Sequence, residues 1–160
     1  MDAFVPIAEG LDVGPALAEL GEAAHFWIDL HGDTQLTIPL TGMDNARLLE
    51  AELPEAWRLI EHVHGLAAER HGDKGALVYA RIGLLPPGTG YPPHVDGIDG
   101  ERLRRYHIAL RGVPDAELVI EGEAKCYEAG EAWWIDAARM HSVANRGESD
   151  RILILFDTLA

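Results

Sequence analysis

The sequence predicts an α+β protein whose second half is rich in β-strands. From Gly75 onward, short runs of apolar and β-branched residues alternate with turn residues, a pattern typical of sandwiches and barrels. Before that point, apolar residues recur at helical spacing between Pro54 and about Arg70. The 160 residues, 48% hydrophobic and 25% charged, suit one globular domain. We therefore expect a single domain over 1–160, with helices and strands in 1–74 and a strand-rich core in 75–160.

Composition excludes several classes of function. The formal net charge of −14 repels phosphate backbones and anionic membrane surfaces, so we expect neither nucleic acid nor membrane as a partner. Cys126 is the single cysteine, which excludes an internal disulfide, and we expect it to be a small core residue in a strand. The first residues do not resemble a signal peptide, and no apolar run approaches the ~18 residues of a membrane span. We expect a cytoplasmic protein.

The N-terminal region is predicted to contain three helices and a hairpin. Gly14-Pro15 after Asp12 indicates a helix start, with a short helix over 16–20 that Gly21 stops. Strands are expected over 26–30 and 35–40, paired as a hairpin around the turn residues 31–33. Asp44 is a candidate cap for a helix through 47–49, and Pro54 suits the first turn of the next helix.

The helix that starts at Pro54 carries one apolar stripe, which we expect to pack on the sheet that follows. The residues of the stripe are Leu53, Trp57, Ile60, Val63 and Ala67. His62, His64 and His71 also fall in this region. Residues two apart on a helix face different ways, so His62 and His64 are not expected to share a metal ion.

Strands of the second half are predicted over 76–85, 104–111, 118–121, 125–127 and 132–136, with Gly122 and Gly130 at turns. Along 104–111, Arg105 and His107 share one face with Arg111, for which we expect solvent contact, and the opposite face is wholly apolar. Trp133 and Trp134 are adjacent, so one should face inward, into the core or as a pocket wall, and the other outward.

Candidate metal ligands stand in Tyr91-Pro92-Pro93-His94-Val95-Asp96-Gly97. In an extended segment, His94 and Asp96 project to the same side and could share one ion. A third ligand of the right type, His141, follows in another short run with strand character. Two histidines and one carboxylate occupy one face of an octahedral ion and leave three positions open, the arrangement of non-haem Fe(II) oxygenases.

An arginine begins the most strand-like run of the chain, residues 151–157. A guanidinium on a buried strand needs an anion, and the planar fork of Arg151 matches a carboxylate. This pairing suits the far end of a dicarboxylate co-substrate.

Taken together, these residues resemble the aspartyl/asparaginyl β-hydroxylase family of Fe(II)/2-oxoglutarate dioxygenases, which includes relatives acting on free amino acids such as proline. The matching residues are His94-Val95-Asp96, Arg105-Tyr106-His107, His141 with Asn145, and Arg151. The resemblance covers about half of the chain, over 76–157. Animal aspartyl β-hydroxylases have glycine in place of the carboxylate ligand, so Asp96 makes this chain more similar to bacterial members with a complete triad.

The resemblance implies a mainly β fold, a double-stranded β-helix (jelly roll, cupin-like) with the N-terminal hairpin and helices packed outside and the metal at the barrel mouth. It implies that His94, Asp96 and His141 bind Fe(II), and that Arg151 and His107 hold the distal carboxylate of 2-oxoglutarate. With O₂ as the further co-substrate, such an enzyme hydroxylates a C–H bond and releases succinate and CO₂. Asn145 is implied to orient a ligand or the backbone.

The expected substrate is a small molecule or peptide: an amino acid, an Asp or Asn residue of a peptide, or a related carboxylate-bearing compound. The family's arginine in the position of Arg105 points towards the substrate, so we expect Arg105 to pair with a substrate carboxylate. The alternative is a cupin-type protein that binds metal or isomerises a substrate, or a metal-binding sensor, without 2-oxoglutarate turnover. Arg151 discriminates between them, because a plain cupin has no need of this guanidinium.

Overall fold

The computed structural model describes residues 2–23, 27–29, 36–41, 52–96 and 103–160. Two helices lie in the described N-terminal part, α1 (Gly14–Glu22) and α2 (Pro54–His71). The strands are β1 (Phe4–Ala8), β2 (Ile28–Asp29), β3 (Leu36–Thr41), β4 (Ala76–Leu85), β5 (Gly90–His94), β6 (Leu103–Arg111), β7 (Ala116–Ile120), β8 (Glu123–Cys126), β9 (Ala132–Ile135), β10 (His141–Asn145) and β11 (Arg151–Leu159).

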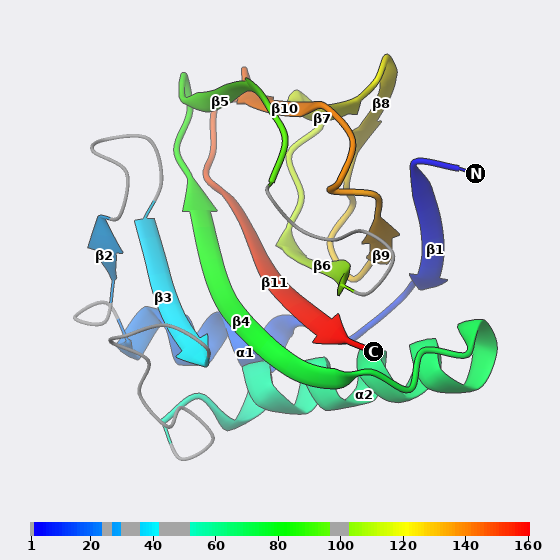
Figure 1. The fold of residues 1–160 in the computed structure, drawn as a ribbon. Coiled ribbons are helices and arrows are strands. Elements are labelled where there is room, and N and C mark those ends of the chain that lie inside the picture. The colour runs from blue at the N-terminus through cyan, green and yellow to red at the C-terminus, as the bar shows by residue number, and fades with distance from the viewer. Residues whose placement is uncertain (1, 24–26, 30–35, 42–51, 97–102) are drawn as a thin grey trace.

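The strands form two antiparallel sheets. The larger has the order β1-β9-β6-β11-β4-β3-β2 and the smaller the order β5-β10-β7-β8. Figure 1 shows the smaller sheet over one face of the larger and the helices beneath the other face. This is the predicted jelly roll with helices outside. The predicted hairpin is also present, as β2 paired with β3, and it extends the large sheet because β3 pairs with β4.

Helix α2 begins with Pro54 in its first turn and ends at Gly72, which caps it in the left-handed conformation with φ 67°. Its N-cap residue, Leu53, offers no side-chain acceptor. The free backbone N–H groups of Glu55 and Ala56 instead donate to the carboxylate of Glu19 on α1, at 2.7 and 3.2 Å. The two helices are therefore joined at this end.

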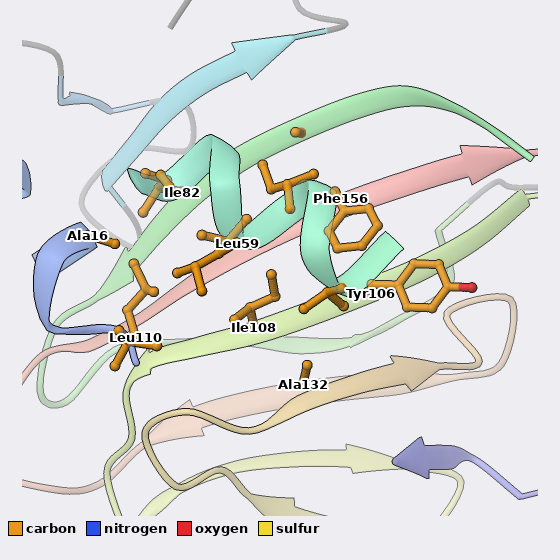
Figure 2. Packing of buried hydrophobic residues seen from close by; sticks show 14 of the residues in the cluster. Ala16, Leu59, Ile82, Tyr106, Ile108, Leu110, Ala132 and Phe156 are labelled. Carbon is orange, nitrogen blue, oxygen red and sulfur yellow. The ribbon is translucent and has the colours of Figure 1, made fainter. Parts of the chain in front are cut away.

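The main core lies between the helices and the large sheet (Figure 2). Alternation along β6 sends Tyr106, Ile108 and Leu110 to the helix side, where each is at most 1% exposed. The predicted stripe of α2 meets them, with Leu53, Ile60, Val63 and Ala67 buried and Trp57 half-buried. Burial of each large aliphatic side chain contributes about 1.5–3 kcal/mol.

Several sequence predictions need correction. Helix α1 runs on to Glu22, so Gly21 lies inside it and does not stop it. Strand β1 was not predicted, because Pro6 interrupts its apolar run, yet it pairs with β9 as an edge strand. Cys126 does lie in a strand but is half-buried, not a core residue, because β8 is the outer strand of the small sheet. Asp44 and the helix predicted through 47–49 lie outside the described residues.

The two tryptophans of β9 face opposite sides of the large sheet, as predicted, but neither side leaves its tryptophan in open solvent. Trp134 packs against the helix-side core, and Trp133 packs against the apolar cluster between the sheets. The ammonium of Lys125 also lies 3.6 Å from the ring centre of Trp133. Among the described residues, neither helix is long and apolar enough to cross a membrane.

Asp73, between α2 and β4, is the acceptor of a buried hydrogen-bond network. The Tyr106 hydroxyl donates to it at 2.5 Å, the Thr158 hydroxyl at 2.6 Å and the Gly75 N–H at 2.8 Å. Burial tends to raise the pKa of Asp73, but the hydrogen bonds outweigh it and leave the pKa below its ordinary value. The network connects the end of α2 to β6 and β11.

We predict that Asp73→Ala lowers the free energy of unfolding by about 3 kcal/mol, since two buried hydroxyls lose a charged acceptor. Because the folded-state pKa of Asp73 is depressed, its contribution is complete above the unfolded-state pKa and is lost as pH falls through the folded-state value. Urea unfolding at pH 7 and pH 3 measures both effects, with the exposed Asp115→Ala as control. Equal stability of Asp73→Ala and Asp115→Ala at pH 7 would contradict this role.

Candidate active site

Three potential metal ligands converge where β5 meets β10. His94 ends β5 and His141 begins β10, and the two are paired across the strands. Asp96 lies two residues past β5, with its Oδ1 3.5 Å from His94 Nε2 and its Oδ2 3.7 Å from His141 Nε2. All three ligand atoms lie within 4.8 Å of one another. The strands approach so closely that a Cβ at Gly90 would come within 2.2 Å of the Val143 carbonyl oxygen, so glycine is required there.

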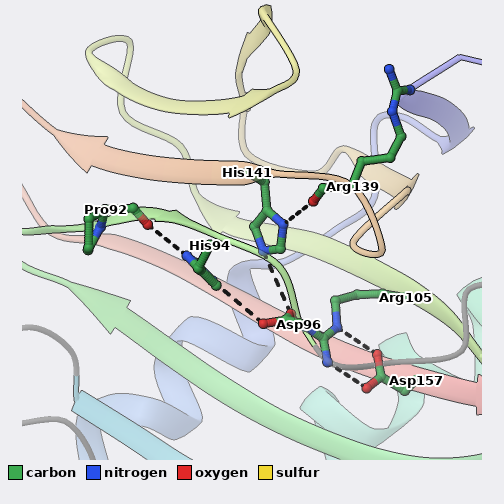
Figure 3. Close-up of polar contacts among 7 residues, drawn as sticks. All are labelled: Pro92, His94, Asp96, Arg105, Arg139, His141 and Asp157. Carbon is green, nitrogen blue, oxygen red and sulfur yellow. Dashed lines mark hydrogen bonds and ion pairs between the residues drawn. The ribbon is translucent and has the colours of Figure 1, made fainter.

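Both imidazole rings are held by the backbone in the same way (Figure 3). His94 Nδ1 contacts the Pro92 carbonyl oxygen at 2.7 Å, and His141 Nδ1 contacts the Arg139 carbonyl oxygen at 2.8 Å. A carbonyl only accepts, so each Nδ1 carries the proton and each Nε2 presents its lone pair towards Asp96. Such hydrogen bonds orient ligating histidines, so the donor set fits a divalent metal ion.

Arg151, at the start of β11, is a buried cation with unused donors. Arg151 is 5% exposed, and its Nε and Nη1 have no hydrogen-bond partner among the described residues. Burial lowers the pKa of Arg151 to about 10, with Tyr127 opposing the shift and Arg81 adding to it. The guanidinium stays protonated at neutral pH, so its surroundings fit an anion.

His107 on β6 is buried and lies on the pocket side of the large sheet. Its Nδ1 is 3.0 Å from the Tyr127 hydroxyl, and its Nε2 has no partner in the part of the chain that the structure describes. Burial, followed by the charge of Arg151, holds the pKa of His107 well below its ordinary value. His107 is therefore neutral at neutral pH, with one ring nitrogen available to a ligand.

Arg105, also on β6, is engaged by two carboxylates. Its Nε and Nη2 donate to the two oxygens of Asp157 on β11, both at 2.8 Å, and its Nη1 contacts Asp96. The sequence predicts that Arg105 shares a face with His107, as the structure has it, but pairing with Asp157 was not anticipated. A substrate-binding role for Arg105 stays a prediction.

The six residues singled out from the sequence all line one pocket of about 470 Å³ between the two sheets. They are His94, Asp96, Arg105, His107, His141 and Arg151. Sequence analysis missed three further polar lining residues, Tyr79 and Arg81 on β4 and Tyr91 on β5. The alternation of Tyr79 and Arg81 along an otherwise apolar strand was the available signal.

Asn145, at the end of β10, orients backbone and not a metal ligand. Its amide nitrogen donates to the carbonyls of Leu85 and Ser149, both at 2.8 Å, and its oxygen accepts from the Gly147 N–H at 3.0 Å. Through these hydrogen bonds Asn145 fixes the turn that places Arg151 at the start of β11. Arg111, at the end of β6, is exposed, as predicted.

Solved structures with a similar fold include an α-ketoglutarate-dependent carbocyclase, a prolyl-4-hydroxylase and a protein that binds nickel and 2-oxoglutarate. A non-haem α-ketoglutarate-dependent carbocyclase of nogalamycin biosynthesis, SnoK, matches with TM-score 0.77 at 16% identity, over 98% of this chain and 79% of that one. A prolyl-4-hydroxylase from Pseudomonas putida matches with TM-score 0.68 at 14% identity, over 99% and 93%. HygX from Streptomyces hygroscopicus, solved with nickel and 2-oxoglutarate bound, matches with TM-score 0.69 at 12% identity, over 98% and 82%.

In sequence, no curated protein matches the chain significantly. The family model for aspartyl/asparaginyl β-hydroxylase does match, over residues 34–160, which include every candidate site residue and both sheets except β1 and β2. Family model, fold and donor set agree on the enzyme class and on its cofactors, iron and 2-oxoglutarate. The chain belongs to the aspartyl/asparaginyl β-hydroxylase family and is a 2-oxoglutarate-dependent oxygenase.

Proposed function

We propose that this protein is a hydroxylase in which His94, Asp96 and His141 bind Fe(II), while Arg151 and His107 bind the distal carboxylate of 2-oxoglutarate. The observation that carries the proposal is the presence, in one pocket, of three converging metal donors and a buried guanidinium with unused N–H groups. The three metal donors suit a cation, and the buried guanidinium suits an anion. The pocket as a whole therefore suits a metal ion together with an anion.

Binding of the co-substrate anion rests on matching donors. Arg151 offers Nε and Nη1, two N–H donors of a buried guanidinium that have no partner among the described residues, and charged donors of this kind suit a carboxylate. His107 can add a third donor: when the Tyr127 hydroxyl donates to Nδ1, the proton of the neutral ring lies on Nε2, on the pocket side. The apolar side chains of Leu153 and Leu155 also line the pocket and exclude water from such a pair.

The residues of the site would position the metal ion and the co-substrate, and Fe(II) with 2-oxoglutarate would supply the oxidising power. Fe(II) with 2-oxoglutarate supplies the activation of O₂ that converts the co-substrate to succinate and CO₂ and puts one oxygen atom into a C–H bond. His94 and His141 hold their lone pairs towards the metal through their Nδ1–H hydrogen bonds, so no ring rotation is needed on binding. Arg151 and His107 set the direction from which the co-substrate reaches the metal.

The substrate class that we propose is an amino acid, an Asp or Asn residue of a peptide, or a related carboxylate-bearing small molecule. The family match supports this class, and so do the cations that line the pocket. Free amino acids and short Asp-containing peptides should be screened for succinate formation coupled to a product heavier by one oxygen atom. Succinate with a product lacking the added oxygen would instead indicate another oxidation outcome on the same site.

Metal binding should stabilise the folded chain, because only the folded state brings the three ligands together. At a free Mn(II) concentration of ~100 times Kd, the expected gain is about 2.7 kcal/mol in unfolding free energy, visible as a higher Tm. His94→Ala and His141→Ala should lose this gain. His62→Ala, which removes an exposed histidine of α2, should keep it. Retention of stoichiometric metal binding by either ligand variant would show that the triad is wrong.

Replacement of the buried Arg151 should affect only the binding of 2-oxoglutarate. Arg151→Gln loses a charged two-point contact, a penalty on the order of 2–5 kcal/mol, and should raise the Kd of 2-oxoglutarate for the Mn(II)-loaded protein accordingly. His107→Ala should weaken binding less, and the exposed Arg111→Gln should not weaken it. Calorimetric titration with 2-oxoglutarate measures all three. Unchanged affinity in Arg151→Gln would favour a cupin-type metal-binding or isomerising protein.

A further inference from the structure

The carboxylate of Asp96 is the least constrained of the three metal ligands. His94 and His141 lie within paired strands and each donates to a backbone carbonyl, whereas Asp96 lies past the last paired residue of β5. A carboxylate that ligates a metal with one oxygen must have its rotation fixed, and side-chain contacts must do this for Asp96.

Arg105 is placed to supply that contact. It approaches Asp96 with Nη1 while its Nε and Nη2, the opposite edge of the same planar group, are bound to Asp157. A guanidinium held at two points cannot turn, so the direction of the remaining N–H groups is fixed. The side chain of Arg105 is 14% exposed, which leaves little room for another arrangement.

Asp157 gives this contact a rigid base. It pairs with Arg105 in register between the neighbouring strands β11 and β6, at the centre of the large sheet. Its side chain is 4% exposed, and both of its oxygens accept from Arg105. Asp157 itself is not among the residues that line the pocket, so it reaches the metal site through Arg105.

We infer that Arg105 is a positioning residue that orients the metal ligand Asp96, and that Asp157 holds Arg105 for this purpose. The inference rests on the proposed triad. It is compatible with the predicted pairing of Arg105 with a substrate carboxylate, because Asp157 and Asp96 use three of the five N–H groups of its guanidinium.

Metal affinity distinguishes positioning from simple charge effects. Arg105→Gln removes a positive charge near the metal, which by Coulomb attraction alone would tighten binding of a divalent cation, whereas Asp157→Asn removes a negative charge and would weaken it. If the pair orients Asp96, both changes weaken Mn(II) binding, by about 10–100-fold as for other groups that orient metal ligands. The measurement is calorimetric titration of the metal-free full chain with Mn(II) alone.

The double variant Arg105→Gln with Asp157→Asn tests whether Asp157 acts through Arg105. It leaves no unpaired buried charge, so it also serves if the single Arg105→Gln chain does not fold. We expect it to bind Mn(II) about as weakly as Arg105→Gln alone, because the same contact to Asp96 is lost. A double variant with wild-type affinity, or one whose loss is the sum of the two single losses, would overturn the inference.

Controls separate this inference from the proposed triad. Arg111→Gln, an exposed arginine on the same strand, should keep wild-type Mn(II) affinity, and His94→Ala should lose it. If His94→Ala binds Mn(II) normally, the triad itself fails. If His94→Ala loses binding while Arg105→Gln binds Mn(II) as tightly as the wild type or more tightly, the triad stands and the positioning role is wrong. A purely structural role would lower the Tm of the metal-free variants without changing the Kd of Mn(II).

Discussion

Backbone pairing of β11 with both β4 and β6 is the constraint on which the other features depend. Alternate residues of β11 serve different layers: Ile152, Ile154 and Phe156 join the helix-side core, while Leu153 and Leu155 face the pocket. Arg151 begins β11 and Asp157 lies near its other end, both on the pocket side of the sheet. A register slip of one residue would turn both charged side chains into the apolar layer under the helices, so this register is strongly specified.

The pocket lowers the stability of the folded chain because it contains buried donors that are ready to bind ligands. Buried donors at Arg151 and His107 lack partners among the described residues, and each unsatisfied group of this kind costs about 1–3 kcal/mol. The apolar layer on the other side of the sheet, where Tyr106 and Phe156 stack with ring centres 4.8 Å apart, offsets that cost. The large sheet thus has two different faces. The helix side is close-packed and stabilises the chain, and the pocket side carries polar groups that can bind ligands.

The sequence was most informative where chemistry restricts the residue type. His94, Asp96, His141 and Arg151 could be selected because few other side chains bind metal or carboxylate, and the structure gathers them at one pocket, although their roles remain proposals. The pairing of Arg105 with Asp157 could not be predicted, since it depends on the register of two distant strands. The capping of α2 by Glu19 could not be predicted for the same reason. It depends on how the two helices pack against each other, and the local sequence does not indicate it.

The arginines of the pocket lie inside a molecule of strongly negative formal charge, −14 overall. A dianion such as 2-oxoglutarate is therefore repelled at long range and attracted only near the mouth of the pocket. Salt screens interactions beyond about 8 Å at physiological ionic strength, but acts much less on buried pairs. Added salt should thus speed the approach of the co-substrate while leaving its rate of release almost unchanged, the reverse of the behaviour of enzymes that steer anions with a basic surface.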